Sequence, residues 1–196
     1  GEQLAVSSCL NPQTRFGDDV VSRIEHASQG EDELAALQSV IIEAMNEIVQ
    51  STLSEVDARC RDVFAVTAVG NTTMHHLLLG ISPSALAQSP YVPVAMTSLS
   101  ISGSELGLAV HPDAAVWILP NIAGWVGADT VGVLLSTALW QSAEVALAID
   151  IGTNGEMALG SRERLITCST AAGPAFEGAH LSCGMRAAAG AIDLVT

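Results

Sequence analysis

The sequence predicts an α/β protein in which strands alternate with helices and pair at least partly in parallel. Short apolar runs with strand character occur at residues 63–69, 115–119 and 145–160. Between them, apolar residues recur with helical spacing at 31–53, and a second apolar helix is expected at about 126–140. Strands that alternate with helices in this way are typical of α/β folds with at least partly parallel sheets.

The N-terminal third is predicted to contain one strand and two helices. Residues 2–10 are read as a strand that ends at Asn11-Pro12. Gly17-Asp18 then offers an N-cap for a short helix with one apolar face. The helix at 31–53 is the clearest element, because acidic residues at its start complement the helix dipole. Its apolar stripe consists of Leu34, Leu37, Ile41, Met45 and Ile48.

A strand-to-helix junction follows the strand at 63–69. The residues Gly-Asn-Thr-Thr at 70–73 lead into a helix that ends at Gly80. The free N–H groups at such a helix start can bind an anion, or the junction is simply capped by Asn71 or Thr72. Both readings stay open at this stage.

Two adjacent histidines, His75 and His76, lie in the helix after this junction. Neighbouring helical residues point about 100° apart and cannot readily chelate one ion. We therefore expect both side chains to have structural roles.

The middle of the chain is expected to lack regular structure. Residues 81–113 are rich in Ser and Pro, with prolines at 83, 90, 93 and 112, and show no clear periodicity. A strand at 115–119 is then stopped by Pro120. In the following NIAGWVGAD stretch, Gly124 and Gly127 are expected to let the start of a helix pack closely against another backbone segment.

The stretch at 145–160, VALAIDIGTNGEMALG, predicts an antiparallel hairpin with its turn at Thr153 to Gly155. Asn-Gly accepts the positive φ that tight hairpin turns require. A turn of this kind leaves backbone N–H groups pointing outward, where they suit phosphate oxygens. A plain structural hairpin is the alternative. The Gly- and Ala-rich, nearly uncharged run at 168–192 argues against it, because such runs allow a close approach of backbone to a ligand.

Composition and charge exclude several classes of protein. The chain has 196 residues, of which 7 are Lys or Arg and 21 are Asp or Glu, giving a net charge of −14. It has no basic cluster for nucleic acid, and its acidity repels anionic membranes. No signal peptide or membrane span is visible, because the most apolar stretch contains Pro120, Asn121 and Asp129.

The four cysteines predict reduced thiols and a cytoplasmic protein. Cys9, Cys60, Cys168 and Cys183 are at least 15 residues apart, so their spacing matches neither an iron–sulfur cluster nor a zinc site. Cysteines without a pairing pattern favour a reducing compartment. Each cysteine is expected to be a small buried residue.

Five motifs in a fixed order resemble the ATPase region of the reductive activators of corrinoid proteins. They are NPQTRFGDDVVSRI, VGNTTMHHLLLG, LPNIAGWVGADTV, DIGTNGEMALG and STAAGPAFEGAHLSCGMRA. These activators are iron–sulfur proteins of the superfamily that contains acetate and sugar kinases, heat-shock chaperones and actin. The resemblance implies a ribonuclease-H-like mixed sheet with helices, that is, an actin- or sugar-kinase-like ATPase fold, incomplete in this chain.

The resemblance also implies a domain division and a fragment. Residues 1–143 correspond to most of the first ATPase lobe, including a linking helix at 125–140, and residues 144–196 begin the second lobe. The first phosphate hairpin and the ferredoxin domain of the family are not found in the chain. We therefore expect an internal fragment whose sheet exposes an unpaired edge, and hence a homo-oligomer.

The site residues implied by the resemblance gather around the hairpin and the linking helix. Asp150 is expected to hold Mg²⁺ through water. Asp129 and Glu156 are the catalytic candidates, with helix capping and a plain surface charge as their respective alternatives. The residues expected to bind the nucleotide are Asp150, Gly152, Thr153, Asn154, Gly155 and Gly173.

The function implied is ATP-dependent reductive activation. ATP and Mg²⁺ would drive closure of two lobes, and an electron from a [2Fe–2S] cluster outside this chain would return the Co(II) corrinoid of a methyltransferase system to Co(I). The partner would be the corrinoid protein of that system. A small-molecule kinase using Asp129 as base, and a non-catalytic binding module, are the alternatives.

Overall fold

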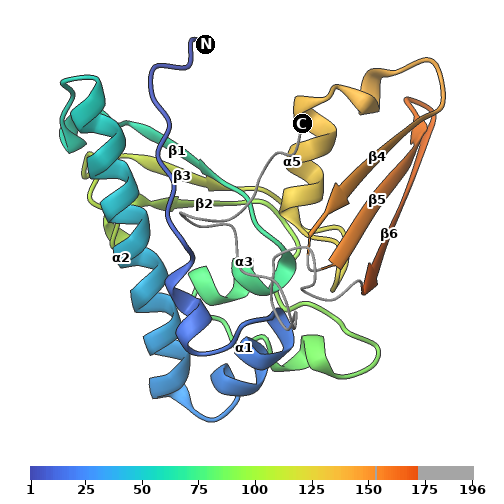
Figure 1. The fold of residues 1–196 in the computed structure, drawn as a ribbon, viewed down its shortest axis with the longest axis horizontal. Coiled ribbons are helices and arrows are strands. Elements are labelled where there is room, and N and C mark those ends of the chain that lie inside the picture. Colours follow the sequence, from blue (N-terminus) through green and yellow to red (C-terminus); the bar gives the residue numbers. More distant parts are fainter. Residues whose placement is uncertain (153, 172–196) are drawn as a thin grey trace, which may run out of the picture. The chain divides into compact units, whose positions relative to one another are not determined.

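The computed structural model describes residues 1–152 and 154–171. The chain divides into two units, Gly1–Val131 and a second unit that begins at Gly132, and each is described by itself. The ribbon in Figure 1 labels the main elements of both. None of the helices in the described residues has the length and apolar character needed to cross a membrane.

The first unit contains a three-stranded sheet and several helices. Its strands are β1 (Ala65–Ala68), β2 (Leu99–Ser102) and β3 (Ala115–Ile118). Its helices are α1 (Val20–Ala27), α2 (Glu31–Glu55), α3 (Thr72–Leu78) and α4 (Gly103–Leu106), with 3-10 turns η1 (Pro12–Arg15), η2 (Cys60–Asp62) and η3 (Ser84–Ala87). Helix α5 (Ala128–Ser136) continues past the boundary of the unit.

The sheet of the first unit is mixed, which agrees with the predicted fold class. The strand order is β1-β3-β2, with β3 parallel to β1 and antiparallel to β2. Strand β2 lies in the region expected to be irregular, so that expectation was wrong. The cause is tertiary, because pairing of Ile101 with Val116 gives this short segment a strand partner that its local pattern does not indicate.

The core of the first unit lies between the sheet and helix α2. Val116 and Ile118 of β3 are buried together with Leu78 of α3. Ile41 and Met45 of α2 pack against the same cluster. Of the stripe predicted from the sequence, Ile41 and Met45 therefore face the sheet, whereas Leu34 and Leu37 pack in a second cluster with Ala27 of α1 and Leu77 of α3. Burial of such apolar side chains is the main favourable term in folding.

The N-terminal segment differs from its prediction. Residues 2–10 form no strand, and Leu4, Val6 and Leu10 are 70%, 66% and 72% exposed. The alternating apolar pattern is present, but no strand in the described residues pairs with it. The Ser7 hydroxyl donates to Ser51 Oγ at 3.2 Å and to Glu55 Oε1 at 3.4 Å, which connects the segment to α2.

The N-cap of α1 and the burial of the cysteines also differ from what the sequence predicts. The N-cap of α1 is Asp19, whose Oδ1 accepts the Ser22 N–H at 2.8 Å, rather than the predicted Gly17-Asp18. Cys9 and Cys168 are exposed and Cys60 is half-buried, so these three cysteines are not the buried residues that were expected.

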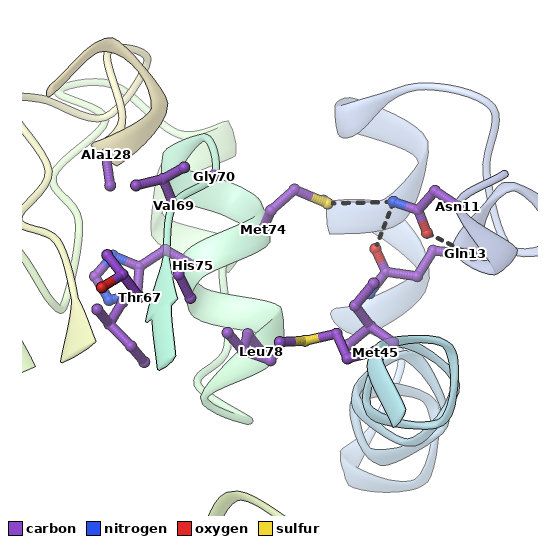
Figure 2. A pocket seen from close by; sticks show the side chains of 13 residues that line it. Asn11, Gln13, Met45, Thr67, Val69, Gly70, Met74, His75, Leu78 and Ala128 are labelled. Carbon is purple, nitrogen blue, oxygen red and sulfur yellow. Dashed lines mark hydrogen bonds between the residues drawn. The ribbon is translucent and has the colours of Figure 1, made fainter. Parts of the chain in front are cut away.

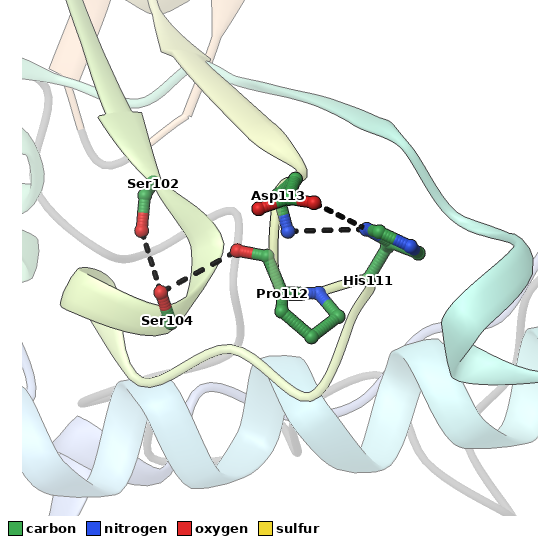
Figure 3. A network of polar contacts seen from close by, with 5 residues as sticks. All are labelled: Ser102, Ser104, His111, Pro112 and Asp113. Atoms are coloured by element: carbon green, nitrogen blue, oxygen red, sulfur yellow. Dashed lines mark hydrogen bonds and ion pairs between the residues drawn. The ribbon is translucent and has the colours of Figure 1, made fainter.

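The connection between β2 and β3 is closed by local polar contacts (Figure 3). The Ser102 hydroxyl caps α4 and lies 2.7 Å from the Ser104 hydroxyl, which donates to the Pro112 carbonyl. Nearby, the Asp113 N–H donates to His111 Nδ1 at 3.1 Å. Ser104, Pro112 and Asp113 are exposed and Ser102 and His111 are half-buried, so we interpret this network as a structural turn.

The second unit carries an antiparallel sheet of order β4-β5-β6. Its elements are η4 (Leu139–Gln141), β4 (Ala146–Ile151), β5 (Asn154–Ser161) and β6 (Arg164–Ala171). The predicted hairpin is therefore confirmed. Its turn is shifted, because Gly155, which was predicted to lie in the turn, already pairs with Ile151 of β4.

Two glycines before α5 bring backbones into close contact, as expected from the sequence. A Cβ on Gly124 would collide with the Tyr91 carbonyl oxygen, and a Cβ on Gly127 would lie 2.5 Å from the Asn71 Cα atom. Both neighbours are main-chain atoms that cannot move aside cheaply. Gly127 therefore fixes how the start of α5 meets the start of α3.

Replacing Gly127 with alanine should destabilise the first unit by about 2 kcal/mol or more, because overpacking against backbone forces the two helix starts apart. Gly30→Ala is the matched control, since its Cβ would meet only the mobile end of the Glu33 side chain. Urea unfolding measures both. Equal stability of the two variants would contradict this account of the contact.

Candidate functional site

The hairpin places two carboxylates directly opposite each other. Asp150 of β4 pairs with Glu156 of β5, and Glu156 pairs in turn with Ser169 of β6. Cross-strand partners have Cβ atoms about 4.5–5.5 Å apart and share one face of the sheet, and like charges in this position destabilise the pair. The Ser169 hydroxyl donates to Glu156 Oε1 at 2.9 Å. A cation between the two carboxylates would relieve their repulsion.

The glycine-rich end of the hairpin is only partly as expected. The Gly152 N–H donates to the Asn154 carbonyl at 3.0 Å, so it is turned into the hairpin rather than outward. Gly155 lies within β5, where a Cβ would come within 3.2 Å of Thr170 Cγ2. Thr153 and Gly173, both predicted to bind nucleotide, lie outside the described residues.

A metal ion at this hairpin would depend on ligands besides side chains. Among residues 1–152 and 154–171, no group of three or more His, Cys, Asp or Glu is arranged to hold a metal. Mg²⁺ commonly keeps several waters and binds through one or two carboxylates plus phosphate oxygens. Asp150 and Glu156 fit that kind of site better than a cage built from protein alone.

Asp129, the other catalytic candidate, belongs to the first unit. It lies in the first turn of α5, where an acidic residue complements the helix dipole. Its N–H donates to the Gly70 carbonyl at 3.1 Å, and its Oδ1 accepts the Thr130 N–H at 2.8 Å. The side chain is half-buried. These contacts tie Asp129 to the strand-to-helix junction after β1.

That junction is capped by its own side chain. Asn71 Oδ1 accepts the Met74 N–H at 2.9 Å, and the Thr72 hydroxyl donates to the Ala123 carbonyl at 2.7 Å. Both alternatives for the 70–73 segment were left open by the sequence, and the structure shows the capping one. Helix α3 has seven residues and its start is already occupied.

Asn121 is a buried polar residue that sequence reasoning did not single out. Its Nδ2 donates to the Ala95 carbonyl at 3.0 Å and its Oδ1 accepts the Ala128 N–H at 3.1 Å. These backbone partners fix which end of the amide carries the nitrogen. The second Nδ2 hydrogen points to His75 Nδ1, so the proton of neutral His75 lies on Nε2. Burial lowers the pKa of His75.

His76 has a structural role, as expected. Its Nδ1 lies 2.7 Å from the Thr72 carbonyl, and its Nε2 accepts the Val94 N–H at 3.0 Å and the Ala95 N–H at 3.3 Å. The ring therefore holds part of the Pro-rich segment against α3. This pattern requires a neutral imidazole, and burial lowers the pKa of His76.

A cavity of about 430 Å³ lies in the first unit, lined mainly by apolar side chains from α2, α3 and β1. Figure 2 shows Met45 and Leu78 on one part of its wall, with Asn11 and Gln13 facing Met74. Gln13 is buried and donates from Nε2 to the Leu37 carbonyl at 2.9 Å. The sequence did not indicate this cavity, because its wall comes from six different elements: η1, α2, β1, α3, β3 and α5.

The pH dependence of stability should reflect these histidines. The folded-state pKa values of His75 and His76 lie below the ordinary 6.5, so the unfolded chain binds protons more readily. Stability is then fully present above about pH 6.5 and falls as the solution is acidified, by up to about 1.4 kcal/mol per pH unit for each histidine.

Urea unfolding of the chain and of a His76→Gln variant between pH 7.5 and 5 measures this effect. The variant should show a shallower decline on acidification than the parent chain. If the variant and the parent chain lost stability equally on acidification, His76 would not be a cause of the pH dependence.

Two family models match the chain. The model described as the RACo middle region matches residues 1–142, and the model described as the C-terminal domain of RACo, the ASKHA domain, matches residues 144–196. The ASKHA match and the mixed α/β fold agree with the fold family predicted from the sequence.

Relatives and a solved structure lead to the same family. The corrinoid activation enzyme RamQ of Eubacterium limosum is 38% identical over 188 residues, which are 96% of this chain and 31% of that protein. The [Co(II) methylated amine-specific corrinoid protein] reductase of Methanosarcina barkeri is 48% identical over 73 residues, or 37% of this chain and 14% of that protein.

A solved reductive activator for corrinoid, iron–sulfur protein has a TM-score of 0.84 and 40% identity, covering 91% of this chain and 28% of its own. The chain thus spans about a third or less of the length of these proteins. With its middle-region match extending over residues 1–142, the chain belongs to the RACo family.

Proposed function

We propose that this chain is part of an ATP-dependent reductive activator that returns the Co(II) corrinoid of a methyltransferase system to Co(I). The support comes from its relatives, one named a corrinoid activation enzyme, one a reductase of a Co(II) corrinoid protein, and one a reductive activator. The partner would accordingly be a corrinoid protein, met in the cytoplasm.

The observation that carries the nucleotide part of this proposal is the pairing of Asp150 with Glu156 across the hairpin. It lies in the part of the chain that matches the ASKHA domain. Asp150 would hold Mg²⁺ through water, and the ion would offset the repulsion between the two carboxylates. Glu156, oriented by the Ser169 hydroxyl, would position the water that attacks the γ-phosphate.

The nucleotide contacts would come from the turn. Gly152, Asn154 and Gly155, together with Thr153 and Gly173, would present backbone to the phosphates, since small residues permit close approach. In the structure the Gly152 N–H is bonded to Asn154. Binding of phosphate would therefore require the turn to release that N–H.

Coupling to reduction would follow from movement of two lobes, one formed by residues 1–143 with its linking helix at 125–140 and one beginning at 144. Asp129, at the start of that helix, would orient water or Mg²⁺ in the closed state. Shifting a two-state equilibrium from 1:99 to 99:1 needs about 5.5 kcal/mol of differential binding. Each 59 mV by which a one-electron transfer is uphill lowers its equilibrium constant by a factor of about ten. The electron would come from a [2Fe–2S] cluster outside this chain.

In the intact protein, Asp150→Asn should lower Mg²⁺-dependent ATP turnover by about tenfold or more, because a neutral amide cannot replace a carboxylate beside the metal. Gly152→Val should weaken nucleotide binding, since a side chain would block phosphate. Steady-state ATPase assays with and without a corrinoid protein measure both effects.

Asp113→Asn is the matched control, because Asp113 is an exposed carboxylate in the first unit, far in the sequence from the hairpin. It should leave turnover unchanged. If both hairpin variants kept full ATPase activity and full corrinoid reduction, the phosphate assignment would be wrong. Phosphorylation of a small-molecule acceptor would instead indicate a kinase.

A further inference from the structure

A short apolar loop of the first unit is exposed to solvent. It lies between η3 and β2 and presents large apolar side chains on a segment that is neither helix nor strand. Its members are Tyr91, Val92, Val94 and Met96, which are 44%, 57%, 68% and 39% exposed. The half-buried Trp125 makes an edge-to-face contact with Tyr91, with ring centroids 6.3 Å apart. Apolar side chains gathered in this way on a protein surface are typical of a binding site.

Buried side chains hold the backbone of this apolar loop in place. His76 Nε2 accepts the Val94 N–H at 3.0 Å and the Ala95 N–H at 3.3 Å. Asn121 donates from Nδ2 to the Ala95 carbonyl at 3.0 Å and from its main-chain N–H to the Met96 carbonyl at 2.9 Å. Both of the side chains that hold the loop are themselves buried. The loop is therefore preorganised for binding, since its backbone is fixed while the Val94 and Met96 side chains remain exposed.

Tyr91 has a backbone conformation that bulky residues seldom adopt. Its φ is 59°, in the left-handed region. Its N–H donates to the Gln88 carbonyl at 2.6 Å, and its carbonyl oxygen packs against Gly124. Strained residues of this kind persist only where their surroundings hold them, and they cluster at functional sites. This conformation sets the Tyr91 ring against Trp125.

The apolar loop lies in an uncharged part of the sequence. Residues 63–104 contain no Asp, Glu, Lys or Arg, although the chain has 21 acidic and 7 basic residues. A basic or acidic partner surface would therefore find no complementary charge in the loop. Aromatic residues and Met are enriched at the centre of protein–protein interfaces, and charged residues are depleted there. The chemistry of the loop thus fits an uncharged, apolar patch on a protein partner.

We propose that the apolar loop is a docking surface for the corrinoid protein. The inference rests on the proposed function, which supplies this partner. Asn121 favours it over other partners, because the same amide bonds the Ala95 carbonyl of the loop and the Ala128 N–H of α5. Asp129, which is proposed to act in the nucleotide site, is the next residue of α5. The loop is thereby connected to the helix that carries Asp129, as coupling of ATP turnover to the corrinoid protein requires.

The test measures binding of the corrinoid protein, with its cobalt as Co(II), to the intact protein by calorimetry. A Val92→Ser/Val94→Ser variant should bind at least tenfold more weakly, because two apolar contacts are lost. Its ATP turnover without the corrinoid protein should stay unchanged, since both side chains are exposed. Val21→Ser is the matched control, because Val21 is an exposed valine of α1, outside the loop. That variant should bind as the parent protein does.

Photo-crosslinking identifies what occupies the loop. With p-benzoylphenylalanine in place of Val92, irradiation should join the intact protein to the corrinoid protein, whereas the same replacement of Val21 should not. Unchanged affinity of the Val92→Ser/Val94→Ser variant would overturn the docking surface and leave the proposed function intact. Crosslinks formed only within the intact protein, or only to a second copy of it, would also overturn the docking surface. If the unaltered protein bound no corrinoid protein, the proposed function itself would be wrong, and this inference with it.

Discussion

The first unit depends on one buried side-chain amide. Asn121, only 5% exposed, bonds to the Ala95 carbonyl, the Ala128 N–H and His75. It therefore joins the Pro-rich segment, the start of α5 and helix α3. Loss of the amide would leave several buried polar groups unpaired, which costs about 1–3 kcal/mol for each group. The position of Asp129 follows from this anchor, because Asp129 is the next residue after Ala128 in α5.

A different constraint shapes the second unit. The register of β4 and β5 forces Asp150 and Glu156 to face each other. Like charges directly opposite each other weaken the pairing of two strands, so the charges of these carboxylates do not stabilise the hairpin. They become useful when a cation is present. The proposed magnesium–nucleotide role thus explains an arrangement that stability alone would disfavour.

The sequence predicted the elements whose signals are local. The helix now seen at Glu31–Glu55 has an acidic start and an apolar stripe, and the hairpin has a short apolar run on each strand, at residues 146–149 and 157–159. The glycines before α5 were also correctly linked to close backbone contact. The helix and the hairpin have causes that lie within a few residues of the pattern that shows them, whereas the glycines indicated a close contact but not its partners, Tyr91 and Asn71.

The missed features depend on distant partners. Strand β2 forms because β3 is available to it, whereas residues 2–10 have a strand pattern and no partner in the described residues. Asn121 is a polar residue in an apolar stretch, and this local pattern is typical of a buried, hydrogen-bonded side chain. Its partners, Ala95 and His75, lie too far away in the sequence to be predicted. That Asp150 and Glu156 face each other follows only from the register of β4 and β5. The sequence placed the turn one residue too late, and a shift of one residue changes which residues face each other.

The central claim is that the β4–β5 hairpin binds a magnesium–nucleotide complex at Asp150, Glu156 and the turn between the two strands. Paramagnetic broadening by Mn²⁺ and ATP in the intact, isotope-labelled protein tests it most directly, because Mn²⁺ replaces Mg²⁺ and affects only nearby amides. The account predicts ATP-dependent broadening of the amides of Asp150, Gly152, Gly155 and Glu156, with those of Ser104 and Asp113 unaffected. Broadening that is absent from the hairpin, or that does not depend on ATP, would contradict it.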